Sequence, residues 1–143
     1  MPKQSLECVG LIFSDQVIRD AGTGKISLIN CFTTLNAASV PFFSPPFFVT
    51  ALVSGFIEKG KSVQFNVSIK KRDTEAFVLK VAGHATIQGT GSPEEVGEMV
   101  WAIPQLNFPE IGVYDLTFAI NGEDIGTRSL LVKPTTAATV QVA

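Results

Sequence analysis

The sequence predicts an all-β protein: a two-sheet antiparallel β-sandwich, an immunoglobulin-like Greek key of about 7–9 strands. Nearly every periodic segment alternates apolar with polar residues, as a strand does, and none has the 3.6-residue stripe of an amphipathic helix. The segment Phe108–Tyr114 has the pattern of a chain reversal that ends in an anchoring tyrosine. Asn121 and Gly122 are the two residues that a type I′ hairpin turn requires.

Length and composition indicate one globular domain. The chain has 143 residues, of which 45% are hydrophobic and 17% charged. A chain of this size buries enough surface to fold without a metal or a disulfide. We therefore expect a single domain over residues 1–143, with a core over about 6–133 and a tail over 134–143 that is extended or disordered.

Charge and hydropathy argue against several partners and compartments. The net charge is −2, and no basic stripe is available to neutralise phosphates, so nucleic acid is not an expected partner. No run approaches the roughly 20 apolar residues that cross a membrane. Glu7 and Asp15 interrupt the first apolar stretch, so no secretory signal is expected. Two cysteines do not form a disulfide framework, and the expected location is the cytoplasm.

Eight strands account for most of the chain. The third is apolar on both faces, which is typical of a central strand. Turn-rich segments and the prolines at 45 and 46 separate the early strands. The expected strands cover about residues 7–13, 25–35, 47–57, 63–69, 77–81, 98–103, 114–120 and 123–131.

The first two strands are nearly symmetric about residues 19–20 and are expected to form a hairpin. Cys8 and Cys31 could then be neighbours across it. Two buried thiols that act as small hydrophobic groups are the favoured interpretation. A disulfide or a two-thiolate metal site is the alternative. Structural zinc usually takes four nitrogen or sulfur ligands, and the chain has only one histidine to add.

Two hairpin registers follow from the pattern. A turn at 72–74 places Ile69 opposite Phe77, and Lys71 opposite Glu75 as an attractive pair. The Asn121-Gly122 turn places Tyr114 opposite Ser129, and the acidic Asp115 opposite Arg128. Opposite charges facing one another support the second register.

Tyr114 fits a tyrosine corner, in which the hydroxyl binds backbone a few residues upstream and locks the crossover between the sheets. Gly112 would allow the tight approach. Together with Asn121 and Gly122, these residues are assigned structural roles. A catalytic or ligand-binding tyrosine is the weaker alternative.

The polar candidates for chemistry are few. His84 is the only imidazole, and any Ser-His-Asp or Cys-His arrangement would need it. Asp15, Arg19 and Asp20 gather around an apolar pair, where an arginine fork could recognise a carboxylate. A solvated connection with one surface ion pair is the favoured interpretation. No residue is assigned to catalysis, a cofactor or a metal.

The segment 42–48 is the clearest candidate for an interaction surface. Phe42, Phe43, Phe47 and Phe48 flank a pair of prolines, which cannot extend a sheet. An exposed aromatic patch on a soluble domain usually marks an interface. The favoured interpretation is nevertheless that the loop folds over the open end of the sandwich and caps its core.

The sequence also resembles a family of uncharacterised bacterial proteins, catalogued as a domain of unknown function. The resemblance rests on the segment 24–29, the Val40-Pro41-Phe42 segment, and Phe108-Pro109-x-x-Gly112-x-Tyr114 with the Asn121-Gly122-Glu123 turn, and it spans about residues 6–133. It implies an all-β fold and a bacterial source, and it brings no known activity, cofactor or catalytic residue. The high phenylalanine content of 42–48 departs from the family pattern.

Three functional classes are open. The favoured hypothesis is a non-catalytic interaction module that presents a sheet face, an edge strand or the 42–48 loop to another protein or to its own copy. A small-ligand or carbohydrate-binding sandwich would need a concave pocket with convergent polar groups. An enzyme would need clustered carboxylates or a histidine-supported nucleophile, and the candidates are scattered along the chain.

Overall fold

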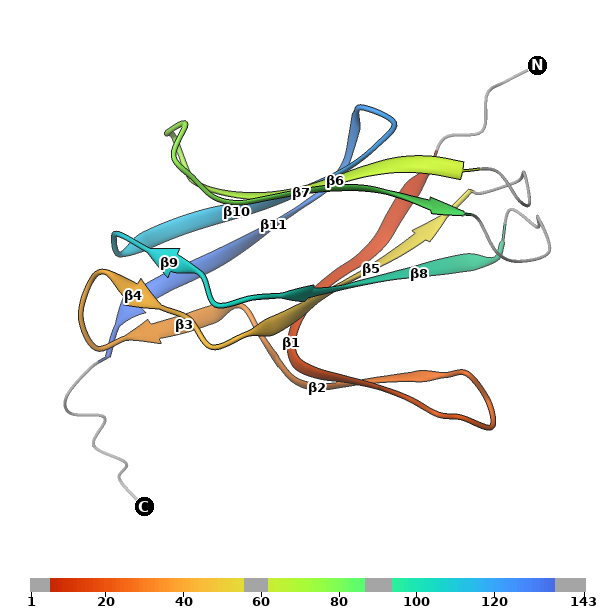
Figure 1. Ribbon diagram of the computed structural model, residues 1–143, viewed down its shortest axis with the longest axis horizontal. Helices are drawn as coiled ribbons and strands as arrows, with labels where there is room; N and C mark the ends of the chain where they lie inside the picture. Colours follow the sequence, from red (N-terminus) through yellow and green to blue (C-terminus); the bar gives the residue numbers. More distant parts are fainter. Residues whose placement is uncertain (1–5, 56–61, 87–93, 136–143) are drawn as a thin grey trace.

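The computed structural model describes residues 6–55, 62–86 and 94–135, and within them it contains strands and no helix. Most of the strands form two packed layers (Figure 1), so the all-β sandwich predicted from the sequence is confirmed. The end of the predicted third strand and most of the predicted tail lie outside the described residues. The strands are β1 (Glu7–Arg19), β2 (Ile26–Phe32), β3 (Thr34–Ala37), β4 (Phe42–Phe43), β5 (Phe47–Ser54), β6 (Ser62–Lys71), β7 (Phe77–Thr86), β8 (Val96–Ile103), β9 (Asn107–Phe108), β10 (Gly112–Ile120) and β11 (Glu123–Pro134).

The strands form a four-stranded sheet in the order β2-β1-β5-β8 and a five-stranded sheet in the order β3-β11-β10-β6-β7. The two-residue strands β4 and β9 pair with each other at one end of the sandwich. All neighbouring strands are antiparallel except β3, which runs parallel to β11. The fold is therefore an immunoglobulin-like sandwich with one parallel pair that the sequence did not predict.

The core lies between the two sheets and consists of alternate side chains of the central strands. On β10, Tyr114, Leu116 and Phe118 are completely buried, and the inward side chains of β5 are buried in the same way. Aromatic rings tie the layers together, because Trp101 of β8 packs against both Phe65 of β6 and Phe118. Inward alternation on central strands accounts for the period-two pattern of the sequence.

Strand β1 is longer than predicted and pairs with two partners. Its first part pairs with β5, and its second part pairs with β2 in a hairpin. The Asp20 carboxylate accepts hydrogen bonds from the two backbone amides of residues 22 and 23, which places the turn later than residues 19–20. Cys31 therefore lies opposite Ser14, and Cys8 lies opposite Val53 of β5.

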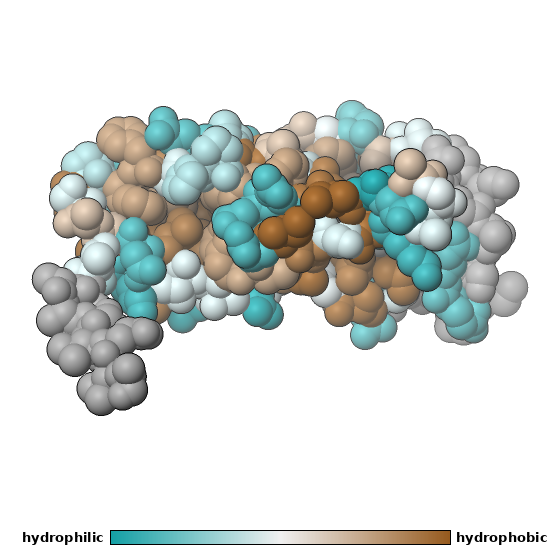
Figure 2. Space-filling model, turned by 90° about the horizontal axis from the view of Figure 1, so that it is seen from below, coloured by the Kyte–Doolittle hydropathy of each residue, from teal (hydrophilic) through white to brown (hydrophobic). Residues whose placement is uncertain are grey.

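The predicted proximity of the two cysteines is thus wrong, and neither forms a disulfide. Cys31 is exposed, contrary to the expectation of a buried thiol. Cys8 is partly buried, donates to the Gly10 carbonyl at 3.3 Å, and has a pKa raised by that burial. Figure 2 views the molecule from the side on which the β1–β2 hairpin projects, and shows apolar residues interrupted by polar ones.

The β6–β7 register differs from the prediction by two residues. Ile69 pairs with Leu79 rather than Phe77, and Phe65 pairs with Gly83. The connection is longer than the sequence suggested, because the amide of Lys71 donates to the Ala76 carbonyl and the ladder is irregular after Ile69. A shift of two residues keeps the regular part of the ladder on its predicted faces, which is why the alternation alone did not exclude it. Phe77 is the exception: it was predicted opposite the inward Ile69, but it pairs with Lys70 and lies on the outward face.

The β10–β11 turn is the predicted one, since Asn121 and Gly122 both have positive φ, at 51° and 81°. A bulge after Phe118 then shifts the register by one residue. Asp115 consequently lies opposite Ser129, and the predicted pair with Arg128 is wrong. The charge partner of Asp115 comes from the β6–β7 turn instead.

Candidate functional site

The chain reversal before β10 is closed by a tyrosine corner. The Tyr114 hydroxyl donates to the Glu110 carbonyl at 2.8 Å, as the sequence predicts. Its ring packs edge-on against Phe108 with centroids 4.9 Å apart, and Gly112 has a φ of 142° that favours glycine. Burial raises the pKa of Tyr114. The hydroxyl is therefore held in a structural role.

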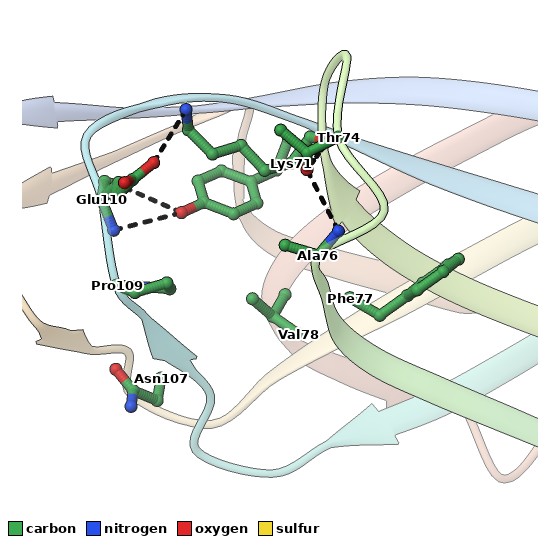
Figure 3. A pocket seen from close by; sticks show the side chains of 9 residues that line it. Lys71, Thr74, Ala76, Phe77, Val78, Asn107, Pro109 and Glu110 are labelled. Carbon is green, nitrogen blue, oxygen red and sulfur yellow. Dashed lines mark hydrogen bonds and ion pairs between the residues drawn. The ribbon is translucent and has the colours of Figure 1, made fainter.

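A pocket of about 580 Å³ opens beside this corner, between the start of β7 and the segment that contains β9 (Figure 3). We call it the corner pocket. One wall comes from the β6–β7 connection and the other from the chain reversal. Its lining residues are Lys71, Thr74, Ala76, Phe77, Val78, Asn107, Pro109, Glu110 and Tyr114.

An ion pair and a short turn shape the corner pocket. Lys71 Nζ lies 2.9 Å from Glu110 Oε2, and this carboxylate raises the pKa of Lys71. The Thr74 hydroxyl donates to the Lys71 carbonyl at 2.8 Å and accepts from the Ala76 amide at 3.1 Å. The pocket therefore combines one compensated charge pair with an apolar wall that includes Phe77.

From this pocket β7 runs along the edge of the five-stranded sheet. In the part of the chain that the structure describes, β7 pairs only with β6. Trp101 of β8, an edge strand of the opposite sheet, packs on Phe65 of β6 and Phe118 of β10. The inward side chains Leu79, Val81 and Ala85 are only partly buried, although they pack on the core.

The outward face of β7 begins with an aromatic ring between two cations. Phe77 is 39% exposed, with Lys80 Nζ at 4.1 Å and Lys70 Nζ at 5.9 Å from its ring centroid. A shallow depression of about 360 Å³ adjoins the ring on this face, lined in part by Asn66 and Ser68. The start of β7 thus borders two concave surfaces.

The four phenylalanines of segment 42–48 do not form a common surface. Phe47 is 2% exposed and belongs to the core, where it contacts the ring of Phe13. Phe42 is half-buried and stacks on Phe108, because β4 pairs with β9. Phe48 is also half-buried. Phe43, at 54% exposure, is the one ring of this segment that is largely open to solvent.

The weak polar candidates are separated in space as they are in sequence. His84 is exposed on β7, opposite Gln64. Asp15, Arg19 and Asp20 belong to β1 and its turn, in the other sheet.

Each of the two charged residues at the end of β1 has a local role. Arg19 forms an exposed ion pair with Glu98 at 3.2 Å and donates to the Gly24 carbonyl at 2.6 Å. Two backbone amides hold the pKa of the Asp20 carboxyl below its usual value. Asp15 is exposed and does not join them in a cluster.

Residues 6–55, 62–86 and 94–135 contain no group of three or more histidine, cysteine or acidic residues placed to hold a metal ion. They also contain no helix with the length and apolar character to span a bilayer.

Sequence reasoning missed the residues that build the corner pocket. Lys71 was predicted only as a partner of Glu75 and Phe77 only as a partner of Ile69, and Glu110 and Asn107 were not singled out. One signal was available. Neither β6 nor β7 contains an acidic residue, although the whole chain has a net charge of −2.

Comparison with known proteins places the chain. A family model described as "Family of unknown function (DUF6941)" matches residues 10–133. The chain belongs to this family. The match covers nearly the same stretch as the motifs that carried the resemblance. The predicted resemblance to a family of unknown function is therefore confirmed. No curated protein matches the sequence.

Solved structures share the fold at low identity. A β-glucosidase from Listeria innocua in complex with isofagomine has a TM-score of 0.50 and 11% identity, over 90% of this chain and 16% of the enzyme. An alkylpurine DNA glycosylase from Pseudomonas fluorescens, bound to DNA containing an abasic site analog, gives 0.48 and 9%, over 92% and 31%. An immunoglobulin-like protein from Pseudomonas aeruginosa gives 0.39 and 14%, over 91% and 98%. The chain spans less than a third of either enzyme, and the likeness concerns the fold alone.

Proposed function

We propose that the protein is a non-catalytic interaction module that binds an extended segment of another protein along the edge strand β7. Of the surfaces considered from the sequence, a sheet face, an edge strand or the 42–48 loop, the edge strand has the best geometry. The loop contributes one largely exposed ring, Phe43, rather than a patch. Binding at a sheet edge gains main-chain hydrogen bonds and takes specificity from the flanking pockets.

One observation carries this proposal: β7 is a ten-residue strand whose outer edge is unpaired among the described residues, and it begins at the corner pocket. Its inward side chains, such as Leu79 and Val81, pack against the core and are left partly exposed at this edge. An added strand would pair with β7 and cover those side chains. Both gains fall on the same edge, which favours this position over the shorter edge strands.

A neutral extended peptide tests the site without assuming a natural partner. A peptide of alternating valine and threonine, as long as β7, is titrated into isotope-labelled protein, and backbone amide shifts are followed by nuclear magnetic resonance. We expect the shifts to concentrate on β7 and on the corner pocket. Shifts confined to β3, β8 or the β4–β9 end, or no shifts at millimolar peptide, would refute the proposal.

Sedimentation of the protein alone completes the test. If a second copy occupies β7, a dimer forms and the peptide converts it to monomer. If the protein stays monomeric and the peptide maps to β7, a different chain is the partner. A dimer that the peptide leaves intact, with β7 unperturbed, contradicts the proposed site.

A second candidate function is supported by the corner pocket itself. Its volume lies within the range of small-molecule sites, and its lining includes the ring of Phe77 and the polar side chains of Asn107 and Thr74. We propose a small polar ligand, such as a sugar, as the alternative occupant. A panel of monosaccharides and disaccharides that stabilises the wild type on heating, and fails to stabilise Phe77→Ala, supports it; equal stabilisation of both proteins contradicts it.

A further inference from the structure

We propose that the segment recognised by β7 alternates apolar with acidic residues. This inference rests on the proposed edge binding and adds the chemistry of the partner. It follows from the difference between the two faces of β7. In a strand added to a sheet, successive side chains point to opposite faces, so each face of the added strand meets one face of β7.

The inward face of β7 requires apolar side chains. Leu79, Val81 and Ala85 pack against the core and are left partly exposed at the edge. On the neighbouring strand β6, the inward Val67 and Ile69 are 1% and 0% exposed. The difference arises because, among the described residues, β6 has a strand on each side and β7 has one. Apolar residues of an added strand would complete this burial.

The outward face of β7 is cationic. The ammonium groups of Lys80 and Lys70 lie 4.1 and 5.9 Å from the ring centroid of Phe77, and Lys70 is the cross-strand partner of Phe77. Lys80 forms no ion pair within residues 6–55, 62–86 and 94–135. Lys70 has a loose pair at 3.7 Å with Glu75, whose side chain is 89% exposed. It also lies opposite Asp115 of β10, whose carboxylate is already bound by Arg72. Acidic side chains on the outward face of a partner would find these two cations.

The remaining cations near β7 are already compensated and do not enter the inference. Lys71 points to the corner pocket and pairs with Glu110. Arg72 pairs with Asp115 through two hydrogen bonds of 3.0 and 2.7 Å. Selectivity for acidic residues is therefore expected to depend on Lys70 and Lys80.

Three peptides of equal length test the inference. Each has ten residues, the length of β7, and alternates valine with glutamate, threonine or lysine; the ends are blocked and one end carries a fluorescent label. Binding is measured by fluorescence anisotropy at low and raised salt. We expect the glutamate peptide to bind at least about tenfold more tightly than the threonine peptide and the lysine peptide to bind least, with the preference reduced by salt.

Charge reversal locates the preference. The double variant Lys70→Glu/Lys80→Glu should reverse the order of the glutamate and lysine peptides. The matched control Lys25→Glu/Lys133→Glu makes the same change of net charge at exposed positions away from β7 and should leave the order unchanged. Circular dichroism and urea unfolding of each variant verify that it is folded.

The outcomes separate the two proposals. If the three peptides bind β7 equally, or if the reversed variant keeps the wild-type order, the acidic partner is wrong while edge binding stands. That result would mean that Lys80 serves only to keep other edges away, a common use of lysine on an edge strand. If none of the peptides perturbs β7, the proposed function itself is wrong.

Discussion

Removing one oxygen atom from the tyrosine corner should measurably weaken the fold. In Tyr114→Phe the ring keeps its edge-on contact with Phe108, and the hydrogen bond to the Glu110 carbonyl is lost. A typical intramolecular hydrogen bond contributes about 1 kcal/mol net. Tyr114 is completely buried, which favours losing the whole contribution of this hydrogen bond. Glu110 is exposed, however, so its carbonyl can accept a hydrogen bond from water instead. We expect a loss of about 1 kcal/mol in the free energy of unfolding.

Tryptophan fluorescence can measure this loss of stability. Trp101 is the only tryptophan and is packed between two phenylalanines of the core, so its fluorescence follows unfolding in urea. A loss of about 1 kcal/mol corresponds to a decrease in Tm of roughly 3–5 °C for a domain of this size. The exposed Thr127→Val serves as the control for removing a hydroxyl on a strand. Equal midpoints for wild type and Tyr114→Phe, with an unchanged m value, would refute the structural role.

The pKa of the same residue gives a second test. Tyr114 is the only tyrosine, so tyrosinate absorbance titrates this group alone. Its raised pKa means that the unfolded chain loses this proton first, near pH 10, so the contribution of Tyr114 to stability is complete below that pH and decreases above it. The folded protein should titrate above the value in urea. The stability difference from Tyr114→Phe should shrink correspondingly above pH 10.

Three further predictions concern other parts of the sandwich. In Gly83→Ala the new Cβ would lie 2.8 Å from the tip of the Phe65 ring, so we expect a loss of roughly 1–3 kcal/mol on urea unfolding, and an unchanged stability would contradict the register. An aromatic disulfide reagent should modify the exposed Cys31 rapidly and the partly buried Cys8 slowly, in two resolved kinetic phases. The guanidinium in the β6–β7 turn lowers the pKa of Asp115, so the stabilisation that this carboxylate provides is present above about pH 4 and is lost on further acidification. Asp115→Asn should therefore be less stable than wild type at neutral pH and approach it at about pH 2, as measured by urea unfolding.

Features that depend on a few consecutive residues could be predicted from the sequence. The tyrosine corner depends on Gly112, Tyr114 and the intervening reversal, and the hairpin turn depends on Asn121 and Gly122. The faces on which most side chains of β6 and β7 lie follow from alternation, up to the irregularity after Ile69 that moves Phe77 to the outward face. These local rules were sufficient for the fold class, because a sandwich is built from strands that each bury one face or both.

Registers and the candidate site were beyond such rules. A bulge after Phe118 shifts one register by one residue, and a longer connection shifts the other by two. Neither event changes the hydrophobic pattern near the turn enough to be recognised. The corner pocket lies between the β6–β7 connection and a reversal about thirty residues later in the chain. No residue pattern in either segment indicates that the two segments lie side by side. Segment 42–48 was considered as a surface because its rings are adjacent in sequence, whereas β4 and β5 direct them to different sites. Phe47 lies in the core, Phe42 stacks on Phe108, and Phe43 is largely exposed.

The four edges of the two sheets explain why one of them is singled out. An edge strand that is not used is usually short, bulged, covered or charged. In the described part of the chain, β3 has four residues and β2 has seven, while at β8 the Arg19 side chain from the β1–β2 hairpin reaches Glu98. β7 has ten residues and, among the described residues, pairs only with β6, and its inward side chains are only partly buried. Lysine side chains on such an edge repel a second copy, which carries the same charge at the same position, and they attract a strand of opposite charge. Defence against self-association and recognition of an acidic partner are therefore compatible consequences of the same two side chains, Lys70 and Lys80.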